Sequence, residues 1–252
     1  MTDSTIQVFD EAPLLRIELN DPERRNALSV SMLDELIGIL EGTAKRDDLR
    51  CVLLHGRGRS FCAGFDLGVV VDEPMRLDDL IQRLSMATRT MRRLPQVVVI
   101  AAQGAAIAGG CALLTGADAV FVEETTTAGY PVHALGVSPA VTIPTLRQAT
   151  GDGRARELLL GGRLLKGPAM VEIGLATHLV PDGNAFDAAM NWAREAAQRS
   201  DNAMRTTKHW INELDGSNDD AAFNGPVAGS AELTGKDEAV DMLSAFWKQR
   251  NS

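Results

Sequence analysis

The sequence predicts an α/β fold in which a largely parallel sheet precedes a C-terminal helical region. Three short apolar segments, residues 51–56, 96–102 and 119–123, have the pattern of strands that are covered on both faces. Segments with apolar residues at helical spacing alternate with them, and this order is typical of βα units in a parallel sheet. From about residue 152 onward the spacing of apolar residues is mostly helical.

The other elements can be placed in order around these strands. Residues 15–19 alternate between apolar and polar side chains, which predicts a half-buried strand. Ser29 or Ser31 can then cap a helix whose apolar residues recur at helical spacing as far as Leu40. Further helices are predicted over residues 78–94, 156–160, 184–199, 203–214 and 239–250.

The composition limits the classes of partner. The 252 residues are 45% apolar and carry a formal net charge of −9, so neither nucleic acid nor an anionic membrane is an expected partner. The stretch MTDSTIQVFD has no basic start or apolar run, and no apolar segment could span a bilayer, so a cytoplasmic location is expected. Cys51, Cys62 and Cys111 lack the spacing of metal ligands; we expect buried thiols and no metal.

Two glycine-rich turns follow predicted strands and are the strongest candidates for chemistry. They read GRGRSFCAGFDLG over residues 56–68 and QGAAIAGGCALL over residues 103–114. A glycine-rich turn that opens a helix leaves backbone N–H groups free to bind an anion. The phosphate-binding patterns GK[ST] and GxGxxG are absent from both turns, which favours a two-donor oxyanion hole. The alternative is that small residues merely let helix and strand pack closely.

Four segments together resemble the crotonase superfamily, which includes the enoyl-CoA hydratases and isomerases. They are DPERRNALS (21–29), FCAGFDL (61–67), GAAIAGGCALLTGAD (104–118) and GLATHLV (174–180). The resemblance implies a ββα spiral core over residues 1–195 that binds an acyl-CoA thioester. It also implies a helical trimerisation region over residues 196–252, in a homotrimer or a dimer of trimers. Coenzyme A would enter as part of the substrate, with no separate cofactor.

The same resemblance implies roles for individual residues. The N–H groups of Phe65 and Gly109 would hold the thioester oxygen while an enolate forms. The backbone near Ala63, Asp66 and Leu67 would meet the adenine of the coenzyme, and Arg24 or Arg25 would lie near its phosphates.

The chain departs from the family where hydratases carry two glutamates. The matching positions hold Ala112 and Val132, so ordinary water addition is expected to be impaired. His133 adjoins the second position and is the candidate acid or base. Adjacent residues of an extended segment point to opposite sides, however, so His133 could face away. Tyr130 could donate a hydrogen bond or could be a packing residue.

The sequence therefore supports an acyl-CoA enzyme that stabilises a thioester enolate by means of an oxyanion hole. Decarboxylation, isomerisation or thioester hydrolysis fits the missing carboxylates better than hydration does. The alternative is a catalytically silent acyl-CoA-binding protein or a non-catalytic subunit. A serine peptidase of the caseinolytic type is disfavoured, because Ser60 and Ser138 do not lie in a nucleophile elbow.

Overall fold

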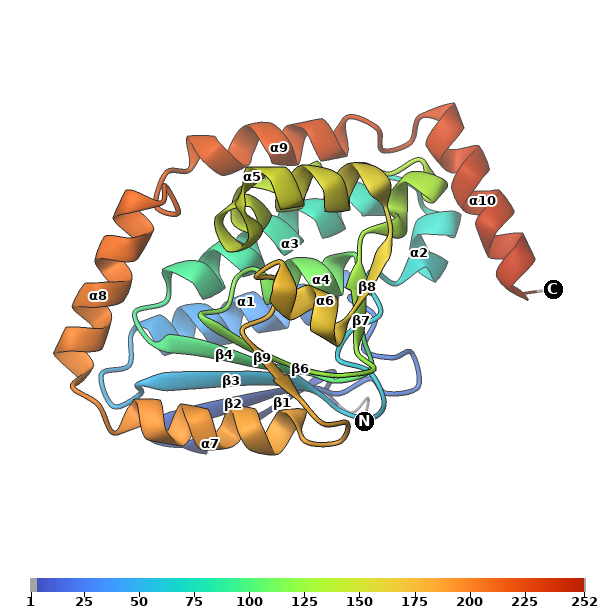
Figure 1. Cartoon of the computed structure of the whole chain (residues 1–252). Coiled ribbons are helices and arrows are strands. Elements are labelled where there is room, and N and C mark those ends of the chain that lie inside the picture. The colour runs from blue at the N-terminus through green and yellow to red at the C-terminus, as the bar shows by residue number, and fades with distance from the viewer. Residues whose placement is uncertain (1–3, 252) are drawn as a thin grey trace.

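The computed structural model describes residues 4–251 and is built on a six-stranded sheet (Figure 1). Its strand order is β1-β2-β3-β4-β6-β9. The first two strands form an antiparallel hairpin, and every later pairing in this sheet is parallel. The strands are β1 (Ile6–Glu11), β2 (Leu14–Leu19), β3 (Cys51–Gly56), β4 (Val97–Ala102), β6 (Ala119–Glu123) and β9 (His178–Val180).

A second, smaller sheet runs across the direction of the large one (Figure 1). Its order is β5-β7-β8, with β5 parallel to β7 and β7 antiparallel to β8. These strands have only three residues each: β5 (Ala105–Ile107), β7 (Thr127–Gly129) and β8 (Leu164–Lys166). Because β5 follows β4 after two residues, the chain passes directly from the large sheet into the small one.

Helices cover both faces of the large sheet, because its central strands are apolar on both sides. In β3, Val52 and Leu54 face one core, whereas Cys51 and Leu53 face the other. The first core is closed by α1 (Val30–Ala44) and α3 (Arg76–Arg93), and the second by α7 (Ala185–Ala197). Shorter segments join the sheets: α2 (Leu67–Asp72), α4 (Gly109–Leu114), α6 (Gly167–Glu172) and the 3-10 helices η1 (Pro131–Leu135) and η2 (Ala140–Thr142).

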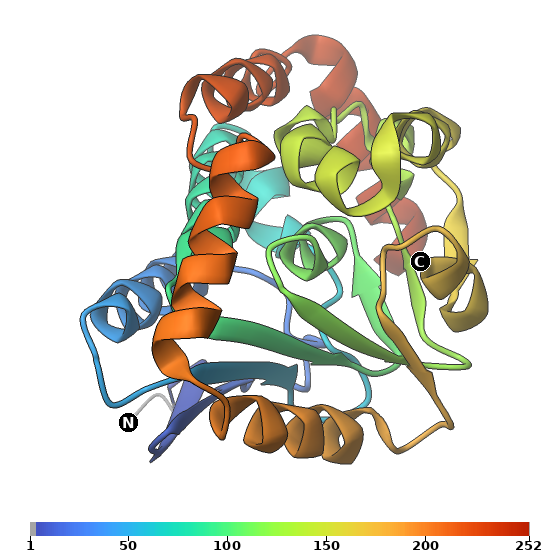
Figure 2. The same cartoon turned by 60° about the vertical axis from the view of Figure 1, so that its left-hand side comes forward.

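The C-terminal helices wrap around the outside of this core. Helix α5 (Ile143–Gly161) lies above the small sheet in the view of Figure 1. Helix α8 (Asp201–Leu214) runs along one side of the molecule (Figures 1 and 2). Next, α9 (Ala221–Ala231) crosses the top, and α10 (Asp237–Asn251) descends beside α2 and η1 (Figure 1). As a result, α10 lies next to α2, which begins at the end of the first glycine-rich turn.

A buried lysine fixes α8 to the sheet. Lys208 Nζ donates hydrogen bonds to the carbonyl oxygen of Gln96 at 2.9 Å and to Asp118 Oδ2 at 2.5 Å. Asp118 Oδ2 also accepts a bond from the N–H of Val98 at 2.7 Å. Burial lowers the pKa of Lys208, and the nearby Asp118 carboxylate opposes that shift. Lys208 and Asp118 therefore connect α8 to the end of the sheet where β4 and β6 begin.

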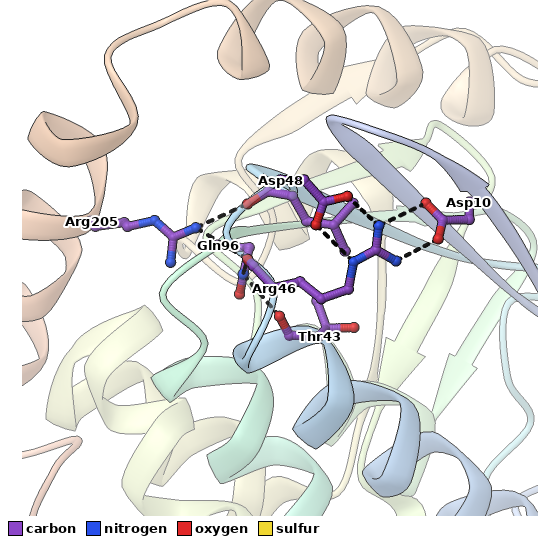
Figure 3. Close-up of polar contacts among 7 residues, drawn as sticks. Asp10, Thr43, Arg46, Asp48, Gln96 and Arg205 are labelled. Atoms are coloured by element: carbon purple, nitrogen blue, oxygen red, sulfur yellow. Dashed lines mark hydrogen bonds and ion pairs between the residues drawn. The ribbon is translucent and has the colours of Figure 1, made fainter.

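A polar cluster locks the turn between α1 and β3 (Figure 3). The buried Gln96 side chain donates to the carbonyl oxygens of Thr43 at 3.0 Å and Arg46 at 2.9 Å. The Arg46 guanidinium pairs with Asp10 on β1 and with Asp48. On the α8 side, Arg205 donates to the carbonyl oxygen of Leu49 at 3.0 Å (Figure 3). These contacts stiffen the end of the sheet at which β3 and β4 begin.

The predicted α/β class and helical C-terminal region are confirmed. Two expectations about the elements were wrong in detail. The helix expected at 156–160 is part of α5, which begins at Ile143, and the mostly helical region also contains β8 and β9. Within residues 4–251, no helix is long and apolar enough to cross a membrane. Over the same range, no cluster of three or more His, Cys, Asp or Glu side chains is arranged to hold a metal.

Candidate active site

The two glycine-rich turns lie side by side, because backbone hydrogen bonds join them into a short ladder. The N–H of Phe61 donates to the carbonyl oxygen of Gln103 at 2.9 Å. One step on, the N–H of Cys62 donates to Ala105 at 2.9 Å, and its carbonyl oxygen accepts from Ile107 at 3.0 Å. The turns after β3 and β4 are thereby held in a fixed relative position.

The N–H of Phe65 is left free by the way in which its neighbours pair with Leu28. The N–H of Leu28 donates to the carbonyl oxygen of Gly64 at 2.7 Å, and the N–H of Asp66 donates to Leu28 at 3.0 Å. Successive N–H groups of an extended chain point to opposite sides, so that of Phe65 faces away from Leu28. Among the residues that the structure describes, it finds no acceptor.

The N–H of Gly109 is free because this residue begins α4. The preceding Ala108 has a left-handed backbone, with φ 49°, and donates to the carbonyl oxygen of Gly129 at 2.8 Å. First-turn N–H groups have no partner within their own helix. In residues 4–251 no other acceptor meets the N–H of Gly109. A Cβ here would lie 3.0 Å from Leu28 Cδ1, so a methyl group fits only if the Leu28 side chain shifts slightly.

Phe65 and Gly109 line one cavity of about 400 Å³. Most of its wall is apolar and comes from α2, α3, α10, the two 3-10 helices and the segment between them: Leu67, Leu77, Leu84, Leu135, Val137, Val141 and Phe246. The buried residues Tyr130 and Thr142 also line it. Of the described residues that line this cavity, Arg25 alone carries a charge. The site can therefore hold an apolar group whose carbonyl oxygen accepts from two N–H donors.

Three of the five residues expected to meet the coenzyme also line this cavity, namely Arg25, Ala63 and Leu67. The N–H of Ala63 donates to the carbonyl oxygen of Arg25 at 3.0 Å, which fixes one to the other. Asp66 and Arg24 do not line it. The Asp66 carboxylate caps α2 by accepting from the N–H of Gly68 at 3.2 Å. Arg24 pairs with that carboxylate at 3.2 Å and is mostly exposed.

Asn26 supports the site, and the sequence did not single it out. Its fully buried side chain donates from Nδ2 to the carbonyl oxygens of Arg57 at 3.1 Å, Ser60 at 2.9 Å and Phe61 at 3.1 Å. Its Oδ1 accepts from the N–H of Asp21 at 2.8 Å. The backbone of Asn26 is left-handed, with φ 54°, a conformation that asparagine tolerates better than most residues. An asparagine inside the DPERRNALS segment was the available signal.

His133 does not share the cavity of Phe65 and Gly109. It is exposed on η1 and lines a separate cavity of about 240 Å³ together with Arg147 and Asp152. Its neighbour Val132 does line the main cavity. The segment is a 3-10 turn, in which successive side chains point about 120° apart. The extended segment assumed from the sequence was wrong, although the side chains of Val132 and His133 do diverge.

Three further residues near the turns are accounted for by packing. Ala112 is buried in α4 and does not line the cavity. Cys62 and Cys111 are also buried, and burial raises the pKa of each thiol to about 12. Thiols with so high a pKa stay protonated at neutral pH and are poor nucleophiles.

Comparison with known proteins agrees with this geometry. The sequence model of the enoyl-CoA hydratase/isomerase family matches residues 10–250. The enoyl-CoA hydratase EchA19 of Mycobacterium tuberculosis is 29% identical over 257 residues, covering 94% of this chain and 91% of that protein. The 1,2-epoxyphenylacetyl-CoA isomerase of Escherichia coli is 29% identical over 214 residues, covering 81% of this chain and 80% of that protein.

Solved structures give the same result for the fold. An enoyl-CoA hydratase/isomerase from Xanthobacter autotrophicus superposes with a TM-score of 0.88. The two chains are 22% identical, and the match covers 98% of this chain and 94% of the other. The crotonase-type fold implied by the four sequence segments is confirmed.

Proposed function

The chain belongs to the enoyl-CoA hydratase/isomerase family, as its four motif segments predicted, and we propose that it binds an acyl-CoA thioester and stabilises the enolate of that thioester. The thioester oxygen accepts hydrogen bonds from the N–H groups of Phe65 and Gly109. One observation carries the proposal: these two N–H groups have no acceptor in the described part of the chain, and their residues line one cavity.

The two donors act on the step in which negative charge moves onto the thioester oxygen. When a bond at the α-carbon breaks, its electron pair is delocalised toward that oxygen as an enolate. Fixed N–H donors stabilise the developing charge without having to reorganise, and each is worth about 3 kcal/mol in comparable enzymes. The apolar wall excludes water and so strengthens this interaction.

The reaction is one that needs the oxyanion hole but does not need two carboxylates. Water addition requires groups that position and deprotonate the water, and Val132 offers none. Ala112 is likewise without a titratable group. Decarboxylation is the better-supported activity, because loss of CO2 forms the enolate without a base; isomerisation and thioester hydrolysis also use the oxyanion hole but would each need a group that moves a proton.

The coenzyme is proposed to lie over the turn that contains Ala63 and Leu67. We propose that Arg25 faces the phosphates of the coenzyme; support comes from its place in the cavity lining and from its positive charge. Arg24 and Asp66 hold the turn in shape through their ion pair at 3.2 Å.

The assembly is proposed to be a homotrimer or a dimer of trimers, with residues 196–252 contributing to the interface. Support comes from α8, which presents three large apolar side chains to solvent: Trp210, Ile211 and Leu214. Leu214 is 85% exposed, which is costly for an isolated chain in water.

A catalytically silent acyl-CoA-binding protein is the alternative. The same cavity favours it, because the described residues that line it include no carboxylate or imidazole that could move a proton. The alternative predicts tight binding without turnover.

Isothermal titration calorimetry with acetyl-, octanoyl- and benzoyl-CoA tests the proposal, with free coenzyme A as the control. We expect at least one thioester to bind more tightly than the free coenzyme. Absence of binding by all three thioesters would contradict the proposal. Incubation with enoyl-, malonyl- and aryl-CoA substrates, followed by mass spectrometry of the products, then separates an enzyme from a silent binder.

A further inference from the structure

One residue of the C-terminal helical region lines the main cavity. It is Phe246 on α10, whereas every other described lining residue lies between Arg25 and Thr142. Phe246 is 37% exposed, and Ala134 on η1 is also exposed; the remaining described lining residues are buried or half-buried. A residue that both lines a cavity and meets solvent lies at the rim of that cavity. Phe246 and Ala134 therefore mark the rim, between α10 and η1.

Close packing of α10 fixes the position of Phe246. Near the start of the helix, Ala239 packs against Gly136, where a Cβ would lie 2.7 Å from the Ala239 Cα. Leu243 is buried in the core to which the apolar cavity wall belongs. Ala239, Leu243 and Phe246 follow one another at helical spacing, so they share one face of α10. The Phe246 ring is thereby held on the side of α10 that faces the site.

The residue after Phe246 places this part of α10 beside the turn that is proposed to carry the coenzyme. The Trp247 indole lies over Gly68, with its Cη2 3.4 Å from the place that a Cβ would take. Gly68 directly follows Leu67, and its N–H donates to the Asp66 carboxylate that caps α2. The C-terminal half of α10 and the turn at residues 63–67 therefore lie side by side.

The size of the cavity determines which part of the ligand meets the rim. A cavity of about 400 Å³ suits an acyl group and its thioester, but it cannot also enclose the nucleotide of coenzyme A. The arm that joins the thioester to the nucleotide must therefore leave the cavity at its exposed rim. This arm carries methylene groups and a methyl-bearing carbon, against which an aromatic ring can pack and so remove apolar surface from water.

We propose that Phe246 positions the ligand by packing against the arm of coenzyme A, with the turn at residues 63–67 on the other side of the arm. Because the arm is attached directly to the thioester, this contact holds the thioester carbonyl at the N–H groups of Phe65 and Gly109. Phe246 takes no part in bond breaking. The inference rests on the proposed binding of an acyl-CoA thioester. It adds a ligand contact that the C-terminal helix of the same chain provides.

Calorimetry with acetyl-, butyryl- and octanoyl-CoA tests the contact. All three thioesters share the arm, so Phe246→Ala should weaken the binding of each by the same factor, about fivefold for the cover lost from one partly exposed ring. Phe246→Leu keeps an apolar side chain and should recover most of the affinity. Phe9→Ala is the matched control, since Phe9 is a half-buried phenylalanine on β1, outside the cavity.

Protection of a thiol shows whether the ligand covers this position directly, a result that a purely structural effect would not produce. Burial raises the pKa of Cys51, Cys62 and Cys111 to about 12, so these thiols do not compete for N-ethylmaleimide at neutral pH. The thiol of Phe246→Cys should react, and saturation with the shortest thioester that binds should slow its reaction at least fivefold. The thiol of Phe9→Cys should react at the same rate with and without the thioester.

The outcomes separate this inference from the proposed function. If no thioester binds to the wild type, both fail. The inference alone fails if Phe246→Ala binds every thioester as tightly as the wild type does, or if the thioester leaves the reaction rate of Phe246→Cys unchanged. It also fails if the loss of affinity grows with acyl length, because Phe246 would then contact the acyl group. Circular dichroism and a melting curve establish that each variant is folded, and Phe246→Cys decides the question if Phe246→Ala does not fold.

Discussion

The ring of Phe65 packs against the backbone of Gly109, where a Cβ would lie 3.3 Å from Phe65 Cε1. This contact joins the two glycine-rich turns at the point where each offers a free N–H. The contact leaves little room at this position, because a side chain larger than a methyl group would push the Phe65 ring away from the helix start.

Removing the N–H of Gly109 should abolish polarisation of the thioester. Gly109→Pro lacks that donor, whereas Gly109→Ala keeps it and adds only the crowding of one methyl group. We expect the infrared carbonyl stretch of a bound, carbon-13-labelled thioester to shift to lower frequency in the wild type and in Gly109→Ala. The shift should be lost in Gly109→Pro. For any reaction found, turnover of the proline variant should fall by about 10²–10³-fold.

A circular dichroism spectrum of Gly109→Pro is the necessary control, because Ala108 already has a strained backbone. If the proline variant folds, binds the thioester and still shifts its carbonyl stretch, the donor role of Gly109 is wrong.

Replacing Asn26 should destabilise the turn that carries Phe65. Asn26→Gly keeps the left-handed backbone but removes a side chain that bonds to Arg57, Ser60 and Phe61. Leaving buried carbonyl groups unpaired should lower the free energy of unfolding by about 3 kcal/mol. Urea denaturation measures it, with Asn20→Gly as the control at a less buried asparagine in the same region. Equal stability of the two variants would contradict the anchoring role.

His55 should make the protein less stable as the pH falls below neutrality. Burial, and then the positive charge of Arg16, lower the pKa of His55 to about 4, although Glu18 Oε2 lies 3.7 Å from its Nε2. The unfolded chain takes up this proton near pH 6.5, whereas the folded protein does not take it up until about pH 4. The histidine therefore costs stability progressively between these values, and none above them.

The variant His55→Gln isolates the contribution of His55 to the loss of stability at low pH, because a glutamine side chain does not titrate. Between pH 7 and pH 5 the wild type should lose about 2 kcal/mol more unfolding free energy than the variant does. Urea denaturation at both pH values provides the comparison. Identical losses would mean that Glu18 pairs with the protonated ring and that the pKa of His55 is not lowered.

The sequence alone predicted the features that depend on residues close together in the chain. The strands at 51–56 and 96–102 are continuous apolar runs, so their burial on both faces could be predicted. The two glycine-rich turns could be recognised from local composition, whereas the pairing of Phe65 with Gly109 was implied by the resemblance to the crotonase superfamily.

The features that were missed depend on contacts between distant segments. Asn26 is buried because the turn at 57–61 folds over it, and a loop asparagine by itself predicts only a turn. The strands β8 and β9 have three residues each, too few for a period to be recognised. The sequence left open where His133 points, because its orientation follows from the 3-10 turn of η1, which a Pro-containing segment does not specify on its own.

Introducing a carboxylate at Val132 should increase hydratase activity. Val132 lines the cavity that contains Gly109, and a glutamate there can accept a proton from water beside the acyl group. With crotonyl-CoA, loss of the enoyl absorbance should be faster in Val132→Glu than in the wild type by about 10²-fold, the lower end for one acid or base group. His133→Glu is the matched control, because it adds the same charge one residue away on the separate cavity. Equal rates in the two glutamate variants would mean that Val132 does not face the reacting carbon, and rapid hydration by the wild type would show that the cavity needs no added carboxylate.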